Sequence, residues 1–304
     1  MTRSPLVSVL LPSFNAGSHL TVAVDSILAQ TFTDFELLVL DDGSSDGSVE
    51  ALAIADPRVH VVTKPNTGLA DTLNVGLEAA RGELAARMDA DDIAHPERLR
   101  RQVEEFEADP DLVLLGTQIQ RFGDQGRLSS SHFPESHHRI RRELLRGQHA
   151  MCHPSIMVRR AVALTCGGYW DYGVAEDWDL FLRLSEAGSI ANTPDVLLSY
   201  RFHDSSINAV GMLDVRRNVM LATTNARRRE EGLGELTPSQ LQDSLSARQR
   251  FLLYREVRAL SYYRRSLQSA GARSRFQLLA ASLIWPEQAL RRIGSRALRR
   301  GGLA

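Results

Sequence analysis

Apolar runs alternate with amphipathic segments over the first 120 residues of the chain. The continuous apolar runs predict buried strands over residues 6–14, 35–40, 59–62, 84–88 and 112–118. Between them, apolar positions at helical spacing predict helices over residues 18–30, 46–55, 68–81 and 96–108. Strands that alternate with helices over short connections are typical of a parallel sheet covered on both faces. We therefore expect an α/β fold whose ligands gather at the carboxyl ends of the strands.

The pattern becomes mixed after residue 128. Residues 149–159 and 196–202 are predicted as strands, and residues 175–186 as a helix. Beyond residue 208 the pattern is helical, and Pro286 separates two further predicted helices, 273–285 and 287–300. We expect a first domain over residues 1–208, in halves of 1–120 and 121–208, and a helical C-terminal extension over 209–304.

Composition is that of a folded protein, which excludes a disordered chain and a disulfide-rich mini-protein. Hydrophobic residues make up 43% and charged residues 24% of the 304 residues. Cys152 and Cys166 do not make a disulfide framework, so a reducing, cytoplasmic setting is the simpler interpretation. No apolar run approaches the roughly 20 residues that cross a bilayer. The run at residues 6–11 is too short for a secretory signal and lacks a cleavage site.

The net charge of −1 conceals an asymmetry along the chain. Residues 210–304 carry +11, from 18 arginines and 7 acidic residues, whereas residues 1–209 carry −12. A split of this kind indicates two parts with different partners. The apolar stretch 276–285, followed by further arginines, can lie peripherally at an anionic membrane surface, or the same helices can pack on the first domain. Nucleic-acid binding is not expected, because no reading motif accompanies the charge.

Three acidic clusters follow apolar runs, namely Asp41-Asp42, Asp89-Ala-Asp-Asp92 and Glu176-Asp177. Crowded carboxylates resist ionisation unless a cation or a hydrogen-bond donor compensates. Asp89 and Asp91, two residues apart where a strand ends, can converge on one hard cation, and oxygen-rich sites favour Mg²⁺ or Mn²⁺. The alternative, that Asp91 and Asp92 cap the helix beginning at Pro96, stays open.

The loops after the second and third predicted strands each have two interpretations. Asp46 is accounted for as the N-cap of the helix predicted over 46–55. The two aspartates before Gly43 either build a turn or place a carboxylate where it can accept from a base imide N–H or a ribose hydroxyl. Likewise, Gly68 either relaxes its loop or lets a helix start approach a diphosphate.

Taken together, six short motifs resemble family 2 glycosyltransferases in their order and spacing. They are Pro12-Ser-Phe-Asn15, Asp41-Asp-Gly-Ser44, Asn66-Thr-Gly68, Asp89-Ala-Asp-Asp92, His153-Pro-Ser-Ile-Met157 and Glu176-Asp-Trp-Asp-Leu180. The resemblance covers residues 4–208 and is greatest to the bacterial branch that builds surface polysaccharides. Phe14 stands where the family usually has Tyr, so base stacking is kept and a hydroxyl contact is lost.

The resemblance implies a GT-A fold, in which a Rossmann-like, mostly parallel sheet flanked by helices binds a nucleoside-diphosphate sugar and a divalent metal. Asp42 is implied as the contact to the base and Asp89 as the contact to the ribose. Asp91 is implied as a ligand of Mg²⁺ or Mn²⁺, and Asp177, with Glu176 beside it, as the catalytic base. The donor-binding residues implied as a set are Pro12, Phe14, Asn15, Asp42, Asn66, Gly68 and Asp89.

The implied reaction is an inverting transfer of the sugar to a hydroxyl of a saccharide or lipid-linked acceptor. The leaving nucleoside diphosphate gathers negative charge, which a metal at Asp91 would offset. A carboxylate on the opposite face of the sugar, Asp177, would take the acceptor's proton. The alternative for the Glu176-Asp177 pair is a charge pair favoured by the helix dipole.

Other residues and other classes of protein also need weighing. His203 either approaches the metal or diphosphate or is a loop histidine. His153 is expected to pack or to face the acceptor, since Cys152 has no second metal-binding pair nearby for zinc. Trp178 is expected to pack or to form an acceptor wall. A nucleotidylyltransferase is disfavoured because no glycine-rich basic loop follows the first strand, and a non-catalytic sugar-nucleotide binder because both Asp91 and Asp177 are kept.

Overall fold

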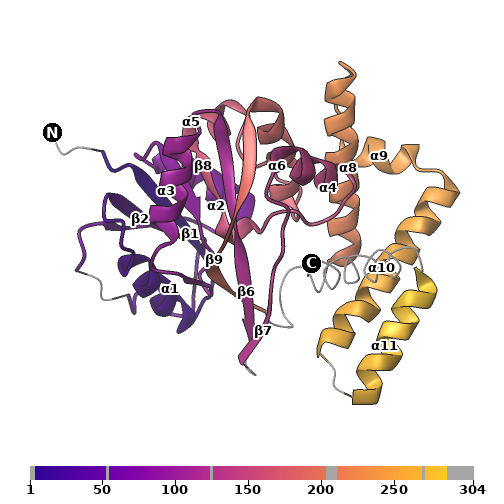
Figure 1. The fold of residues 1–304 in the computed structure, drawn as a ribbon, viewed down its shortest axis with the longest axis horizontal. Coiled ribbons are helices and arrows are strands. Elements are labelled where there is room, and N and C mark those ends of the chain that lie inside the picture. Colours follow the sequence, from indigo (N-terminus) through magenta and orange to yellow (C-terminus); the bar gives the residue numbers. More distant parts are fainter. Residues whose placement is uncertain (1–3, 53–54, 124–125, 203–210, 269–270, 286–304) are drawn as a thin grey trace, which may run out of the picture. The chain divides into compact units, whose positions relative to one another are not determined.

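The computed structural model describes residues 4–52, 55–123, 126–202, 211–268 and 271–285 (Figure 1). The chain divides into two compact units. The first comprises Met1–His203 and Ala222–Gly234, and the second comprises Asp204–Leu221 and Glu235–Ala304. Helix α8 (Met212–Glu230) contributes to both, because its second half packs with the first unit.

The first unit is built on a nine-stranded sheet in the order β3-β2-β1-β4-β8-β6-β9-β5, with β7 paired to β6 (Figure 1). The strands are β1 Val7–Ser13, β2 Phe35–Asp41, β3 Val59–Thr63, β4 Leu84–Arg87, β5 Ile93–Ala94, β6 Leu112–Gly123, β7 Gly126–Ser130, β8 Met157–Arg159 and β9 Ser189–Arg201. The helices of this unit, besides the second half of α8, are α1 His19–Leu28, α2 Leu69–Ala79, α3 Arg98–Ala108, α4 His137–Leu145, the 3₁₀ turn η1 His153–Ser155, α5 Arg160–Thr165 and α6 Glu176–Ala187.

The first half of the sheet is parallel, as the alternating pattern predicts. Strand β1 lies between β2 and β4 and pairs in parallel with both, and β3 pairs in parallel with β2. Every residue of β1 and β2 is buried, which is why these strands appear in the sequence as continuous apolar runs. Ser13 lies opposite Asp41 in the register, so the loops that follow β1 and β2 start side by side.

Helices cover both faces of this half of the sheet. The apolar face of α1 packs into the same core as Val9 and Leu37. Helix α2 packs on the other face, where a Cβ added to Gly76 would lie 2.5 Å from a Leu40 methyl and 3.3 Å from a Leu10 methyl. The close approach of α2 to the sheet therefore depends on glycine at position 76.

The second half of the sheet is mixed. Strand β8 pairs antiparallel with both β4 and β6, whereas β6 and β9 are parallel. The fully buried Arg98 of α3 secures this junction, because its guanidinium donates to the backbone oxygens of Arg87 and Ile156 at 2.6 and 3.2 Å. The α/β fold class is confirmed, with parallel pairing concentrated in the half that begins the chain.

Two of the predicted elements are wrong in whole or in part. Residues 46–52 form turns instead of the helix predicted over 46–55, because the Asp46 side chain binds Ser48 and the next residue, Gly47, has φ +74°. Residues 149–159 contribute a strand only at Met157–Arg159, since Pro154 belongs to the turn η1. The pattern also did not predict the short strand β5, the hairpin strand β7 or the helices α4 and α5.

The second unit is helical, as predicted. Besides the first half of α8 it contains α9 (Pro238–Ser244), α10 (Ala247–Gln268) and α11 (Gly271–Ile284). Thr237 begins α9 with a capping box to Gln240, and an ion pair between Arg216 and Glu256 links α8 to α10. The helix predicted over 287–300 lies outside the described residues. Within the part of the chain that the structure describes, no helix has both the length and the apolar character needed to cross a membrane.

Candidate functional site

Three of the predicted donor-binding segments lie along one edge of the sheet. Strands β2, β1 and β4 are neighbours and parallel, so their carboxyl ends point to the same edge. Asp42 follows β2, Phe14 follows β1, and Asp89 lies two residues beyond the end of β4. Pro12 is buried within β1 opposite Leu40 and so helps to set where Phe14 emerges.

Hydrogen bonds join the loop after β1 to the loop after β2. The Asn15 backbone N–H donates to Ser44 Oγ at 3.0 Å, and the Ser45 N–H donates to Asn15 Oδ1 at 2.8 Å. Asn15 has φ +50°, a conformation that asparagine tolerates better than most residues. Beside this joint the Phe14 side chain is 54% exposed, so its ring is available for stacking.

Asp42 is buried and is held from the loop that precedes α2. Its Oδ1 accepts from Lys64 Nζ at 2.6 Å and from the Thr67 N–H at 3.0 Å, and its Oδ2 accepts from the Gly68 N–H at 3.0 Å. Burial raises the pKa of Asp42, but the hydrogen bonds from Lys64 and these amides outweigh it, so the pKa is lowered. Asp42 is therefore an anion whose position is fixed by the loop, through the N–H groups of Thr67 and of Gly68, the N-cap of α2.

The same loop carries the remaining donor-binding residues named from the sequence. Gly68 has φ +96°, which glycine adopts without strain, and this conformation turns its N–H toward Asp42. Asn66 is exposed. A Cβ added to Gly43 would lie only 2.9 Å from the backbone nitrogen of Asn66, so there is no room for a side chain at position 43. The loops after β2 and β3 thus meet closely. Lys64, the only lysine of the chain, is the residue of this group that the sequence analysis missed.

Three aspartates gather where β4 ends. One carboxylate oxygen from each of Asp89, Asp91 and Asp92 lies within 4.8 Å of the others. Asp92 is buried, its Oδ1 accepts from the Arg201 N–H at 2.8 Å, and its Oδ2 has no hydrogen-bond partner among the described residues. Burial, followed by the charges of Asp89 and Asp91, raises the pKa of Asp92 well above its usual value. An unsatisfied buried oxygen within a cluster of carboxylates fits a hard divalent cation.

A buried arginine stands next to this cluster. Arg87, the last residue of β4, is 4% exposed and forms an ion pair with Asp89 at 2.5 Å. Among the described residues, its Nε and Nη1 have no hydrogen-bond partner. Its charge also acts on Glu176 and Asp92. The sequence analysis did not consider Arg87, although a charged residue inside an apolar strand is a visible signal, and it named Asp92 in the cluster without a role as a metal ligand.

The Glu176-Asp177 pair begins α6, directly after Ala175 in the left-handed conformation at φ +61°. Glu176 is buried, with Oε1 at 3.6 Å from His153 Nδ1, and burial followed by the charge of Asp177 raises the pKa of Glu176 to about 7. Asp177 is half-buried and accepts from the Trp178 N–H at 2.9 Å. Burial raises the pKa of Asp177 too, although Arg87 opposes the rise. Two proton-binding carboxyl groups therefore lie side by side within the field of the acidic cluster.

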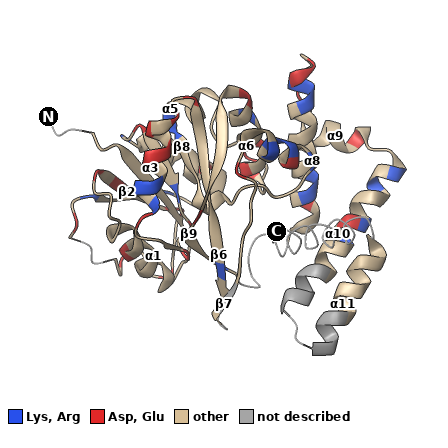
Figure 2. Ribbon diagram, viewed as in Figure 1, with Lys and Arg blue, Asp and Glu red and all other residues tan. Residues whose placement is uncertain are grey.

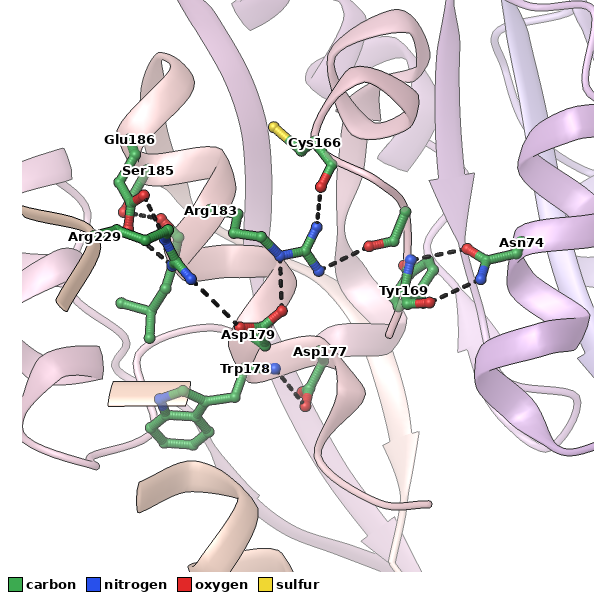
Figure 3. A network of polar contacts seen from close by, with 12 residues as sticks. Asn74, Cys166, Tyr169, Asp177, Trp178, Asp179, Arg183, Ser185, Glu186 and Arg229 are labelled. Atoms are coloured by element: carbon green, nitrogen blue, oxygen red, sulfur yellow. Dashed lines mark hydrogen bonds and ion pairs between the residues drawn. The ribbon is translucent and has the colours of Figure 1, made fainter. Parts of the chain in front are cut away.

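A network of polar contacts fixes the start of α6 (Figure 3). The fully buried Asp179 accepts from Arg183 Nε at 2.7 Å and lies 3.9 Å from Arg229, which comes from the second half of α8. Arg183 also donates to the backbone oxygens of Cys166 and Gly168. These contacts tie α6 to the loop that precedes it and so fix the position of the Glu176-Asp177 pair.

Asn74 of α2 clamps the same loop from the other side (Figure 3). Its Oδ1 accepts from the Tyr169 N–H and its Nδ2 donates to the Tyr169 oxygen, both at 2.8 Å. The Tyr169 hydroxyl lies 3.0 Å from His153 Nε2. His153 is buried against Phe181 and Tyr169, and Trp178 is buried with its Nε1 donating to the Leu144 oxygen. His153 and Trp178 are therefore packed, which was one of the two expectations for each residue. His203 lies outside the described residues.

Comparison with known proteins decides the family. A family model described as Glycosyl transferase family 2 matches residues 8–167. The chain belongs to this family. The matched residues include five of the six motifs quoted above, and the Glu176-Asp177 motif follows shortly after them.

Relatives of the chain are named for the synthesis of amylovoran, hyaluronan and chondroitin. The amylovoran biosynthesis glycosyltransferase AmsE of Erwinia amylovora is 31% identical over 210 residues, which cover 67% of this chain and 79% of AmsE. The hyaluronan synthase of Pasteurella multocida is 30% identical over 219 residues, which cover 70% of this chain. The chain spans 22% of the length of that synthase and 24% of the Pasteurella multocida chondroitin synthase.

Solved structures share the fold. S. aureus TarS 1-349, crystallised with UDP-GlcNAc, has a TM-score of 0.60 and 16% identity, with 93% of this chain and 92% of that chain covered. The mannosyltransferase PcManGT of Pyrobaculum calidifontis, in complex with GDP-Man and Mn²⁺, has a TM-score of 0.56 and 18% identity, with 95% of this chain and 84% of that chain covered. At these identities the likeness is one of fold, and it agrees with the GT-A architecture expected from the sequence motifs.

Proposed function

We propose that the chain is an inverting glycosyltransferase that moves a sugar from a nucleoside-diphosphate sugar to an acceptor hydroxyl. The observation that carries this proposal is the placement of two carboxylate groups around Arg87. The aspartates at 89, 91 and 92 lie at the end of β4, and the Glu176-Asp177 pair begins α6. The first group, once it holds a divalent ion, suits the diphosphate of a donor, and the second suits the hydroxyl of an acceptor.

The donor would bind along the carboxyl edge of the first half of the sheet. Phe14 offers an exposed ring for stacking on the base, and Asp42 offers a carboxylate to the base edge. Asp89, which is one-third exposed, would contact the ribose. Pro12, Asn15, Asn66 and Gly68 shape this site through the two joined loops rather than through charge.

Mg²⁺ or Mn²⁺ would be held by Asp91 together with the carboxylates of Asp89 and Asp92, and His203 remains a candidate ligand from outside the described residues. When bound, such an ion stabilises the negative charge that develops on the leaving diphosphate. The hard oxygen donors present favour this class of ion over zinc or copper.

Asp177 would act as the general base. It would take the proton from the acceptor hydroxyl as that oxygen attacks the anomeric carbon from the face opposite the leaving group, which inverts the configuration. The raised pKa of Asp177 makes it a stronger base than an exposed aspartate. Glu176 would hold the acceptor or the shared proton beside it, and the network of Asp179 and Arg183 would keep both carboxyl groups in place.

The names of the relatives support a place in cell-surface polysaccharide synthesis, on a saccharide or lipid-linked acceptor. We propose residues 1–208 as the catalytic domain, completed by the packing of 222–234, and the remaining basic helices as an extension. The enzyme would act in the cytoplasm, and the extension would contact the inner face of the cell membrane peripherally. The charge of +11 over residues 210–304 supports that contact.

Release of nucleoside diphosphate from sugar nucleotides, measured with Mn²⁺ present, tests the proposal. The substitution Asp177→Asn should lower turnover by about 10²–10⁴-fold while donor affinity changes little. Asp195→Asn, at an exposed position of β9, is the matched control and should behave as the natural chain. Binding of sugar nucleotides without any turnover by the natural chain would favour a non-catalytic sugar-nucleotide binder instead.

A further inference from the structure

Arg87 is unusual because its guanidinium, itself a cation, is buried beside the aspartate cluster that suits a divalent metal ion. Its side chain is 5% exposed, and its Nη2 lies 2.5 Å from Asp89 Oδ1. Burying a guanidinium is costly unless its charge is offset nearby. The groups that offset it are the carboxyl groups of Asp89 and, at longer range, Glu176 and Asp92. The sheet therefore supplies the acidic cluster with a fixed positive charge of its own.

This fixed charge lowers the attraction of the cluster for a free divalent ion. Carboxylates that converge within 4.8 Å would by themselves attract such an ion strongly. A positive charge held a few ångströms away repels the ion, and burial of the arginine limits the screening of that repulsion by water. A diphosphate that enters with the ion adds negative charge and reverses this balance.

We infer that Arg87 makes binding of the divalent ion depend on the donor, so that the ion binds tightly only together with the diphosphate. This inference rests on the proposed function, in which the Asp89-Asp91-Asp92 cluster meets a diphosphate. By linkage, the ion and the nucleotide then raise each other's affinity by the same factor. The chain would in this way avoid holding an ion in a site that has no donor.

The substitution Arg87→Met separates this role from a structural one, because the two roles predict opposite signs. Methionine fills similar space without charge, and the Asp89 carboxylate that it releases is 32% exposed and can be hydrated. Loss of a repelling charge should tighten Mn²⁺ binding in the absence of nucleotide by about tenfold to a hundredfold. If Arg87 only held Asp89 in place, the same substitution would weaken Mn²⁺ binding.

Isothermal titration with Mn²⁺ alone, and then with Mn²⁺ in the presence of UDP or GDP, measures both quantities. The natural chain should bind Mn²⁺ weakly alone and much more tightly with a nucleoside diphosphate. In Arg87→Met this enhancement should shrink by about the factor that free Mn²⁺ binding gains. Arg87→Lys, which keeps the charge, should resemble the natural chain, as should Arg58→Met, a control in which a cation paired with Asp56 is lost elsewhere.

Unchanged or weaker Mn²⁺ binding by Arg87→Met would overturn the inference while leaving the proposed function intact. Tight Mn²⁺ binding by the natural chain without nucleotide would overturn it as well. Failure of the natural chain to bind any nucleoside diphosphate would remove the proposed function and the inference together. A thermal melt of each variant shows whether it folds. If Arg87→Met does not fold, Arg87→Lys still tests whether a positive charge at this position is compatible with weak binding of free Mn²⁺.

Discussion

Replacing Glu176 with glutamine should stabilise the folded chain in neutral and alkaline solution. Glu176 is 8% exposed, and its pKa lies at about 7 instead of the ordinary 4.5, first because of burial and second because of the charge of Asp177. A carboxyl group with a raised pKa binds its proton more tightly in the folded than in the unfolded chain. Its ionisation therefore opposes folding, and glutamine removes this cost while it keeps the shape of the side chain.

The magnitude follows from the two pKa values. Below about pH 4.5 both states are protonated, and Glu176 contributes nothing that depends on pH. Between pH 4.5 and about 7 the unfolded chain ionises first, so stability falls with rising pH. Above that window the free energy of unfolding is lower by about 3 kcal/mol, which is the difference between the two pKa values converted at about 1.4 kcal/mol for each unit. Burial is nearly complete, so screening by water does not reduce this figure substantially.

Urea unfolding of the natural chain and of Glu176→Gln, at pH 4.5 and at pH 8 without added metal, measures the effect. The difference in unfolding free energy between the two proteins should be small at pH 4.5 and should favour the variant by about 3 kcal/mol at pH 8. Glu78→Gln, at an exposed position of α2, is the control and should show no such change. A Glu176→Gln difference that is the same at both pH values would refute the reasoning.

Two further predictions concern the metal cluster and the network behind α6. Removal of divalent ions with EDTA should weaken nucleoside-diphosphate binding strongly, because the crowded carboxylates of Asp89 and Asp91 then repel the diphosphate. Isothermal titration measures this affinity, and equal values with Mn²⁺ and with EDTA would contradict the assignment of a metal to this cluster. Arg183→Met should lower the unfolding free energy by about 3–5 kcal/mol, because it takes away the guanidinium 2.7 Å from the fully buried Asp179. Urea unfolding checks the second prediction, and a loss below about 1 kcal/mol would contradict it.

The sequence predicted best those parts of the fold that are buried from both sides. Strands such as β1 and β2 are apolar at nearly every position because helices cover both faces of the sheet. Their parallel order then places the polar residues that follow them at one edge. A ligand site at this edge could be expected from that rule alone, whereas a sugar nucleotide as its ligand was implied only by the resemblance of the motifs.

The parts that periodicity did not predict depend on contacts between distant residues. The turns over residues 46–52 form because Asp46 binds Gly17 and Ser48 instead of capping a helix. Asp42 was expected to contact a base, but the sequence did not predict that Lys64 holds its carboxylate in place. Arg87 has a role only through Asp89 and the acidic pair on α6, which lies nearly 90 positions further along the chain. The sequence shows each of these residues, but which of them pair is visible only in the structure.

The last prediction concerns the apolar face of α11. Phe276, Leu279 and Leu283 are 68%, 64% and 82% exposed, and their spacing places them along one side of the helix. No charged residue interrupts the helix over residues 276–284, as Figure 2 also shows, while the segment 210–304 carries +11. An exposed apolar stripe within a basic segment suits the interface of an anionic membrane, where the side chains enter the headgroup region.

Flotation with anionic vesicles at low salt tests this interpretation. The natural chain should float, and replacing the three stripe residues, Phe276, Leu279 and Leu283, with serine should return it to the soluble fraction. Serine at Val61 and Val196, exposed valines of the first unit, provides the control. Substitution is preferable to truncation after residue 208, because the second half of α8 packs with the first unit and brings Arg229 to Asp179. If the natural chain stays soluble, the stripe is not a membrane contact, and the arginines of the extension are simply solvated.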